Sequence, residues 1–354
     1  MEKYLDIFIN GYQNYAGYLW REITFQIRPL WHNYFWMLVL VSAFFFVLEV
    51  IRPWRAQQPK FRQDFWLDLF YMFFNFFLFS LLIYNASSDV IVNLFNEGIM
   101  AFSSFDLQAS NPMNTWPLWA ILMTGFIVRD FIQWWTHRLL HKLPALWEFH
   151  KVHHSVAQMG FAAHLRYHWM ENIVYRSIEY IPLALLGVGL HDFFLIHIFT
   201  LIWGHYNHAN FRISGRVTGA VVFGFLGLFV TTSSYDLSWV MVLGATMGGA
   251  VLGAAVIGPY MKYIFNSPEM HIWHHAYELP KTRTTGVNFG LTLAIWDYIW
   301  KTDYIPHDGR DIRLGFPGVE KYPHDFASQN LHGFGLTRHE KEHKELRGFA
   351  EKNS

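Results

Sequence analysis

Three long apolar runs lie in the first half of the chain and predict helices that cross a membrane. They occupy residues 34–51, 65–84 and 116–132, and each is rich in Phe, Leu or Ile with Trp or Tyr near an end. A helix of about 20 apolar residues crosses a hydrocarbon core of roughly 30 Å, and aromatic residues gather at its two interfaces. The pattern indicates a multi-pass membrane protein.

Two further apolar stretches are each predicted to fold back as a helical hairpin. The first, residues 173–204, is interrupted by GVGLHD; the second, 217–258, turns at TTSSYDLS. The second also has the small-xxx-small spacing that suits close helix packing in lipid, through Gly244, Gly248, Gly249 and Gly253. The N-terminal twenty residues lack the features of a secretory signal and are typical of an amphipathic segment at the membrane.

Basic residues are distributed unevenly between the predicted spans. Residues 52–62 contain four Lys or Arg, whereas residues 85–115 contain none. The positive-inside rule therefore places 52–62 in the cytoplasm and 85–115 outside. A third span at 116–132 then returns the chain to the cytoplasm, where we expect the histidine-rich segments and the C-terminal tail to lie.

The amino-acid composition restricts which partners and which kinds of metal site are expected. Hydrophobic residues make up 53% of the chain and charged residues only 15%, against about 25% charged in soluble domains. The net charge is zero and no basic block stands out, so a nucleic-acid partner is not expected. Without cysteine, a metal site here has to use histidine, oxygen or water.

Histidine clusters recur at helical spacing. The motif H-x-x-H-H occurs twice, in HKVHHS at 150–155 and HIWHHA at 271–276, and HRLLH, HLRYH and HYNH add further pairs. Residues at i, i+3 and i+4 share one helix face, so each triplet can direct its imidazoles to one side. Because one ion takes four to six ligands, a set this large predicts two metals that share a dinuclear centre.

The missing motifs restrict which metal is expected. HExxH is absent, so the general-base glutamate of a zinc protease has no candidate. Two redox-active ions beside lipid favour activation of dioxygen against a C–H bond, for which iron supplies the oxidant. Two alternatives remain open, namely a zinc-dependent membrane lipid hydrolase and a metal transporter.

The boxes HRLLH, HKVHHS, NHANF and NSPEMHIWHHA, with the closing segment TTGVNFGLTLAIWDYIWKTDYIP, resemble the fatty acid hydroxylase/sterol desaturase superfamily, in particular its bacterial members. The resemblance covers residues 115–305. It implies an all-α, multi-pass helical membrane protein with a cytosolic histidine-rich helical cap that holds two iron ions (Fe2+/Fe3+). It also implies hydroxylation or desaturation of a lipid with O2 as co-substrate, the lipid being a sterol, fatty acyl or ether lipid.

By the same resemblance, ten histidines are expected to ligate the metals: His137, His141, His150, His153, His154, His168, His208, His271, His274 and His275. His164 and His205 are expected to be structural or to support the ligands. Asp130, Glu171 and Asp297 are candidates to orient a ligand imidazole through its second nitrogen. No catalytic residue is expected beyond the metal centre.

The remaining expectations concern organisation and partners. The chain divides into an N-terminal segment with two spans (1–114), a catalytic domain (115–305, including the hairpin 217–258) and a polar cytosolic tail (306–354). No flavin- or nicotinamide-binding motif and no haem-binding domain is recognised, so electrons are expected from a separate donor protein. The resemblance places the protein in a bacterial inner membrane, with the lipid substrate drawn from the bilayer.

Overall fold

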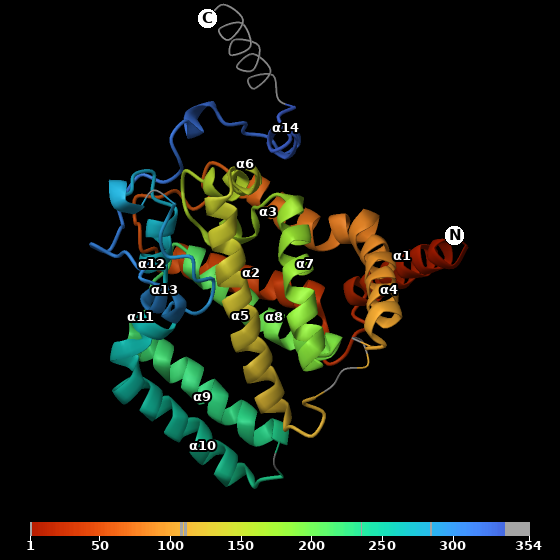
Figure 1. The fold of residues 1–354 in the computed structure, drawn as a ribbon. Helices are drawn as coiled ribbons and strands as arrows, with labels where there is room; N and C mark the ends of the chain where they lie inside the picture. Colours follow the sequence, from red (N-terminus) through yellow and green to blue (C-terminus); the bar gives the residue numbers. More distant parts are fainter. Residues whose placement is uncertain (1, 107–108, 110–111, 235, 284, 337–354) are drawn as a thin grey trace, which may run out of the picture.

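The described part of the chain is a helical assembly. The computed structural model describes residues 2–106, 109, 112–234, 236–283 and 285–336, and among these it has no strands, only the isolated bridges Phe265–Leu293 and Ala276–Leu314. The longer helices are α1 (Glu2–Ile23), α2 (Tyr34–Ile51), α3 (Phe65–Phe73), α4 (Asn85–Ser103), α5 (Leu118–Lys142), α6 (Pro144–His154), α7 (Trp169–Leu186), α8 (Leu190–His208), α9 (Gly215–Ser234) and α10 (Trp239–Leu252). The all-α prediction is confirmed (Figure 1).

Short elements join and follow these helices. They are η1 (Leu30–His32), η2 (Phe74–Leu78), η3 (Ser80–Tyr84), η4 (Phe161–Leu165), η5 (Gly253–Ile257), η6 (Gly258–Tyr260), α11 (Met261–Ile264), α12 (Pro268–His274), η7 (Lys281–Arg283), α13 (Ile295–Trp300), η8 (Val319–Lys321) and α14 (Phe326–His332). Residues 337–354, the end of the predicted polar tail, lie outside the described residues.

Four described helices are long and apolar enough to cross a membrane. They are Tyr34–Ile51, Phe65–Ser103, Gly215–Ser233 and Trp239–Ile264. Their outer faces carry exposed apolar side chains, among them Phe44, Leu82 and Val240, the last of which is 81% exposed. Such faces need lipid rather than water around them, and the chain is a multi-pass integral membrane protein, as predicted.

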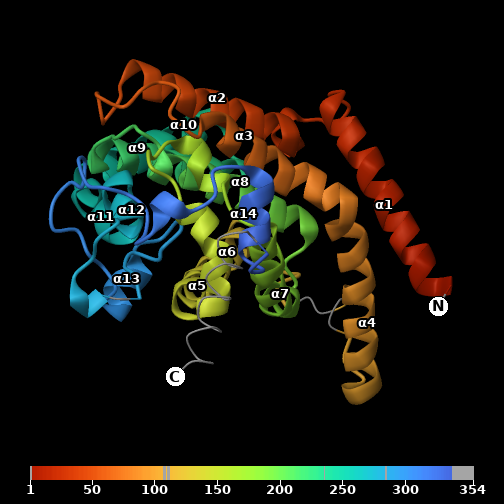
Figure 2. The same ribbon diagram turned by 90° about the horizontal axis from the view of Figure 1, so that it is seen from above.

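The second of these helices is longer than the sequence pattern indicated. Residues 85–103, predicted to be part of an external loop, continue the helix that starts at Phe65 and form α4. The π-helical segments η2 and η3 lie between α3 and α4. Wide turns of this kind interrupt the regular hydrogen-bond ladder and are a known cause of helix bending, and the chain changes direction between α3 and α4 (Figure 2).

The expected third span, residues 116–132, is not one of the four candidate membrane helices. Residues 116–132 belong mostly to α5, which is not among the four apolar helices. Arg129 and Asp130 lower its hydropathy, and both side chains are buried against other parts of the protein. The hairpin expected at 173–204 also forms, as α7 and α8, but neither is apolar enough to count as a span. The expected return of the chain to the cytoplasm through 116–132 stays a prediction.

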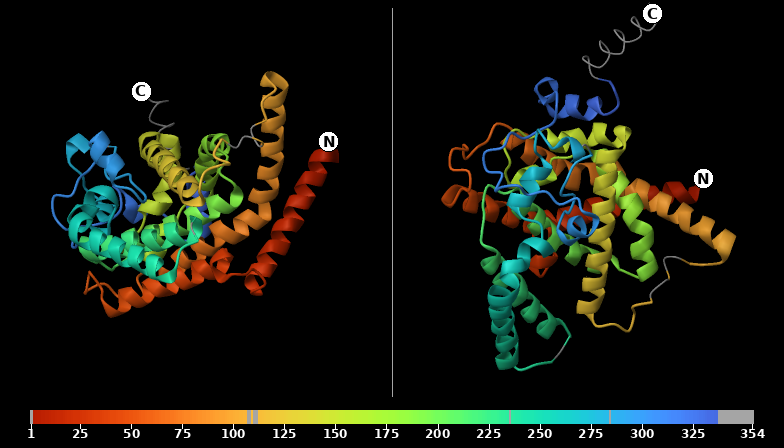
Figure 3. Two further views of the ribbon diagram at one scale, coloured as in Figure 1. Left: turned by 90° about the horizontal axis from the view of Figure 1, so that it is seen from below. Right: turned by 60° about the vertical axis from the view of Figure 1, so that its left-hand side comes forward.

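The hairpin predicted at 217–258 is confirmed as α9 and α10, which lie side by side (Figures 1 and 3). Glycine permits this approach at particular positions. A Cβ built on Gly253 lies 2.1 Å from the Gly219 carbonyl oxygen, and one on Gly249 lies 2.3 Å from that of Phe223. Gly244 and Gly248 have open space instead. Only half of the glycines with the predicted spacing therefore lie at the interface.

This difference gives a stability prediction. Replacing Gly253 by Ala is expected to lower the free energy of unfolding by about 1–3 kcal/mol, because the two helix backbones have to separate. Gly248→Ala, five residues earlier in the same run, is the matched control and should leave the free energy of unfolding unchanged or raise it slightly. Thermal unfolding of the detergent-purified variants measures both, and equal midpoints would contradict the packing described here.

Two more contacts set the outer shape. The amphipathic N-terminal segment is α1, which packs along α4, with the Tyr4 hydroxyl 2.8 Å from Glu97 Oε2 (Figure 2). After the last histidine box, α14 packs against α6, and Gln329 Oε1 accepts a hydrogen bond from the Tyr71 hydroxyl at 3.0 Å. Residues 306–336 thus lie against the helical body, whereas the predicted division into three parts stays a prediction.

Candidate metal centre

Nine buried or half-buried histidines from four helices meet in the interior. The end of α5 brings two and the end of α8 brings one, whereas α6 brings three and α12, with the residue that follows it, brings three. Local sequence begins both short helices: Pro144 and Pro268 occupy first-turn positions, and the Ser267 side chain caps α12 by accepting from the Met270 amide. The histidines form two groups, His137, His141, His150, His154 and His274 in one and His153, His208, His271 and His275 in the other.

Within each group the potential ligand atoms lie within 4.8 Å of one another. Pairs of Nε2 atoms approach still more closely, at 3.2 Å for His137 and His150, 3.1 Å for His154 and His274, and 2.9 Å for His208 and His271. Each H-x-x-H-H triplet supplies both groups. His150 and His154 join the group of five, whereas His153, between them in the sequence, joins the group of four.

The outward nitrogens of four imidazoles reach backbone carbonyl oxygens. These contacts fix the orientation of each ring and, with Nδ1 donating, leave the Nε2 lone pair directed into the group. The pairs are His137 with Phe289 at 2.8 Å, His153 with Arg166 at 3.0 Å, His208 with Gly204 at 2.8 Å and His274 with Val287 at 2.8 Å.

Burial keeps the imidazoles neutral, which is the form that binds metal. It lowers the pKa of His137 to about 4 and that of His153 to about 3. Two ring nitrogens, His141 Nε2 and His275 Nδ1, are buried without a hydrogen-bond partner. Many neutral, inward-facing imidazoles match the donor set of iron, copper, nickel or zinc. One of them, His141 in the group of five, also has an unsatisfied ring nitrogen. The residues fit two metal ions.

One of the three candidate carboxylates orients a ligand directly. Glu171 Oε2 lies 2.9 Å from His150 Nδ1, a contact that holds the imidazole ring in its orientation. Asp130 and Asp297 touch no histidine of the two groups; they accept hydrogen bonds from the segment 289–296 instead. Because Phe289 supplies the carbonyl for His137, Asp297 acts on the site through the backbone.

Replacing Glu171 by Gln is expected to weaken metal binding by about 10–100-fold, because the amide is a poorer acceptor for the His150 Nδ1 proton. Glu148→Gln is the matched control, since Glu148 lies on α6 beside the site but pairs with Lys151. Competition with a chromophoric chelator measures the affinity of each variant. An unchanged affinity in Glu171→Gln would show that the carboxylate plays no part in holding the ligand.

The structure does not bring His168 to either group. Its Nδ1 accepts from the Met170 amide at 3.0 Å and so caps α7, while Nε2 lies 3.0 Å from the Asn330 carbonyl oxygen. Both ring nitrogens are engaged, so none is left for a metal. His164 and His205, expected to be supporting residues, also lie outside both groups, with their Nδ1 atoms 3.1 Å apart.

The sequence pattern did not predict a buried charge network that supports His153. Arg166, whose carbonyl receives the His153 contact, directs its guanidinium to Asp64 at 2.8 Å and Asp68 at 3.1 Å. Asp68 also pairs with Arg62. Asp68 itself could have indicated this network, because it is a charged residue inside an apolar run. Such residues in membrane proteins are usually paired and functional.

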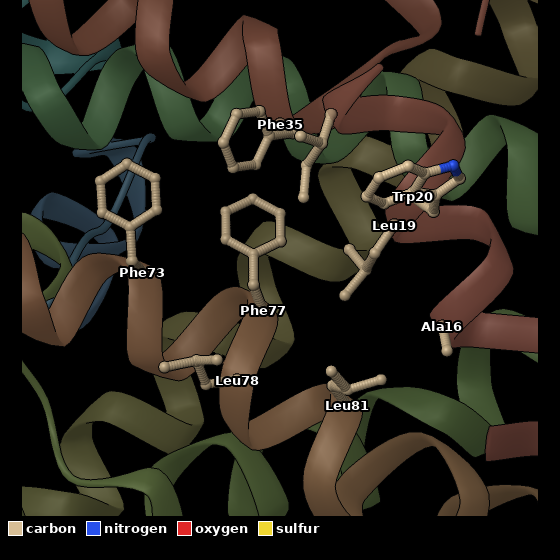
Figure 4. A pocket seen from close by; sticks show the side chains of 9 residues that line it. Ala16, Leu19, Trp20, Phe35, Phe73, Phe77, Leu78 and Leu81 are labelled. Atoms are coloured by element: carbon tan, nitrogen blue, oxygen red, sulfur yellow. The ribbon is translucent and has the colours of Figure 1, made fainter. Parts of the chain in front are cut away.

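Two cavities differ in their lining. A cavity of about 130 Å³, whose wall combines apolar side chains with charged ones of α5 and α7, lies directly beside the histidines and is bounded by His137, His150, His153, His208 and His271. An apolar cavity of about 410 Å³ lies between α1, α2 and the segment from α3 to η3, where Leu19, Phe35, Phe73 and Phe77 face one another (Figure 4). No residue lines both, so the apolar cavity is not where the histidines act.

The fold and the site together define an integral membrane protein with a histidine-rich site suited to metal binding. A model of the fatty acid hydroxylase family matches residues 122–302, which include all nine grouped histidines, and the chain belongs to this family. The resemblance stated from the histidine boxes is therefore confirmed.

Two relatives can be compared with the chain. It is 26% identical to the ornithine lipid hydroxylase OlsE of Rhizobium tropici over 203 residues, which are 57% of this chain and 47% of the relative. It is 30% identical to the very-long-chain aldehyde decarbonylase GL1-10 of Oryza sativa subsp. japonica over 105 residues, which are 29% of this chain and 35% of the relative. The chain thus matches less than half the length of either relative. No solved structure matches it significantly.

Proposed function

We propose that this chain is a membrane-bound non-haem di-iron oxidoreductase that hydroxylates or desaturates a lipid with O2. The observation that carries the proposal is the pair of histidine groups, five and four residues with ligand atoms within 4.8 Å, in a chain of the fatty acid hydroxylase family. The ligand set proposed from the structure is those nine histidines, without His168.

The protein's own residues have three tasks in this reaction. The two histidine groups hold the irons, which when bound supply the oxidising power needed to break a C–H bond. The backbone carbonyls and Glu171 hold the imidazole rings in their ligating orientation. The burial of His271 and His275, both fully inaccessible, keeps bulk water away from the site.

Electron balance requires a donor. Hydroxylation combines one C–H bond, O2, two electrons and two protons into an alcohol and water, and desaturation takes two hydrogens from the lipid and yields an alkene and two waters. In both, two electrons come from the substrate and two from outside. We propose that a separate redox protein supplies them on the cytoplasmic face, the side that the basic segment 52–62 favours.

The lipid is proposed to enter from the bilayer, in which the exposed apolar helices lie. The alternatives are a zinc-dependent lipid hydrolase and a metal transporter. Family membership and the hydroxylase relative favour oxidation over hydrolysis. A transport path would need ligands spaced along the membrane-crossing helices, whereas the nine histidines are concentrated in one buried site outside the four spans.

The experiment supplies the iron-loaded full-length protein with bacterial total lipid extract, 18O2 and reduced ferredoxin. We expect oxidised lipids to form only with O2 and reductant, carrying 18O if the product is an alcohol and losing two hydrogens if it is an alkene. The His153→Ala/His274→Ala double variant, which removes one ligand from each group, should be inactive. Lipid ester cleavage without O2 would establish the hydrolase alternative instead.

A further inference from the structure

The cavity beside the histidines has several charged side chains in its wall. On the side of α5 and α7 it is lined by Arg129, Glu171, Asn172, Arg176 and Glu179. Charged side chains inside a membrane protein are costly and tend to mark the path of a substrate or ion. The groups that already have hydrogen-bond or ion-pair partners need no ligand. The groups without partners indicate what kind of ligand the cavity can bind.

Most of the charge is internally paired. Arg129 contacts Glu179 at 3.4 Å and donates to the Thr200 hydroxyl at 3.0 Å, and Gln133 donates to the second Glu179 oxygen at 2.7 Å. His197 closes this network, with Nε2 3.0 Å from the Tyr34 hydroxyl. The network needs no ligand.

Two donors on α7 have no acceptor. Arg176 packs its guanidinium 4.7 Å from the centre of the Phe193 ring, but among the described residues it donates no hydrogen bond and forms no ion pair. Asn172 uses its oxygen to accept from the Tyr167 hydroxyl at 3.2 Å, and its amide nitrogen is buried without a partner. Since residues four apart lie on the same helix face, both donors belong to one wall of the cavity.

The cavity volume limits what fits between these donors and the histidines. A cavity of about 130 Å³ is close in size to an engineered protein cavity of roughly 150 Å³ that holds one benzene molecule. That is room for a carboxylate or phosphate and a few attached atoms, and not for a long acyl chain. The Arg176 guanidinium, which has no acidic partner among the described residues, places the anion at the Arg176 end of the cavity.

We infer that Arg176 and Asn172 bind the anionic group of a lipid headgroup, a carboxylate or a phosphate, and that the oxidised C–H bond lies in or next to that headgroup rather than in the middle of an acyl chain. This rests on the proposed function and names its substrate class. A guanidinium is well suited to such a group because its fixed fork of donors matches the oxygens of carboxylate and phosphate.

Binding by the iron-loaded full-length protein in detergent tests the inference without turnover. The probes are three lipids with identical acyl chains: phosphatidic acid, an N-acyl amino acid carrying a free carboxylate, and neutral diacylglycerol. We expect at least one anionic lipid to bind about 10–100-fold more tightly than diacylglycerol, as one charged hydrogen-bonded contact provides. The two anionic probes separate the phosphate source from the carboxylate source.

Variants then assign the preference to Arg176. Arg176→Gln should abolish it, Arg176→Lys should retain part of it, and Arg216→Gln, which changes an exposed arginine of α9, should bind as the original protein does. Bound iron and a monodisperse elution profile establish that each variant is folded. If Arg176→Gln does not fold, the lipid preference of the original protein and of Arg176→Lys decides.

Two outcomes overturn the inference: equal binding of all three lipids by the original protein, or an undiminished preference in Arg176→Gln. Mass-spectrometric fragmentation of the oxidised product adds an independent check, since the change should appear in or beside the headgroup fragment. Anionic preference without any O2-dependent turnover would leave the cavity assignment standing and remove the proposed function. Oxidation in the middle of an acyl chain, with no effect of Arg176→Gln, would support the proposed function and overturn the cavity assignment.

Discussion

Replacing His271 by Ala is expected to reduce bound iron from about two ions per chain to about one or fewer, and to lower the oxidation rate by about three orders of magnitude or more. His271 Nε2 lies 2.9 Å from that of His208 and 3.2 Å from that of His275, so it is central to the group of four. Its loss leaves three ligands on one side of a dinuclear site.

His168→Asn is the control for this experiment. Asparagine is a good helix cap and preserves the role that His168 plays at the start of α7, while it removes the imidazole. Iron analysis and the O2-dependent assay on both variants separate a ligand from a structural histidine. Equal iron loss in the two variants, or full iron in His271→Ala, would contradict the assignment of ligands to the two groups.

The second large effect is expected at Asp297. Its carboxylate accepts four hydrogen bonds, from the Trp134 indole at 3.0 Å, the Thr302 hydroxyl at 2.6 Å, and the amides of Phe289 and Gly290 at 2.9 and 2.8 Å. The side chain is completely buried. Asp297→Ala leaves four buried donors without an acceptor, which should lower the free energy of unfolding by about 3–5 kcal/mol.

Asp297→Ala should also lower iron content, because the Phe289 carbonyl that orients His137 lies in the segment that Asp297 holds. Asp297→Asn keeps one acceptor oxygen, so its stability and iron content should lie between those of the original protein and those of Asp297→Ala. Asp311→Ala, an exposed aspartate nearby in sequence, should behave as the unchanged chain. Thermal midpoints combined with iron analysis test this, and a stable, iron-loaded Asp297→Ala would show that the donors find other partners.

Spacing along the chain predicted most of the site because helix geometry is local. The histidines of HRLLH, HKVHHS and HIWHHA all reach the interior, as one-sided helix positions should. The division of each triplet between two groups was not predictable. At 100° per residue, positions i and i+4 are separated by about 40° and i+3 lies about 60° to the other side of i, so a small rotation of the helix decides which ion each ring faces.

The same limit explains the remaining differences. His168 has the spacing of a ligand, and only its tertiary contacts with Met170 and Asn330 show that both nitrogens are used. The run at 116–132 is apolar enough to suggest a span, yet Arg129 and Asp130 find buried partners that a hydropathy pattern cannot show. The helix from Phe65 to Ser103 continues past the apolar residues because α4 packs on α1, a contact between distant segments.

The sequence order of the ligands has a consequence for how the protein is made. Each histidine group combines residues before position 209 with residues after position 270, and the hairpin of α9 and α10 is synthesised between them. A ribosome-bound chain that has produced only the first boxes has just His153 and His208 of the group of four. The group of four can therefore be completed only after the hairpin has been synthesised, so the second metal site cannot form on an unfinished chain.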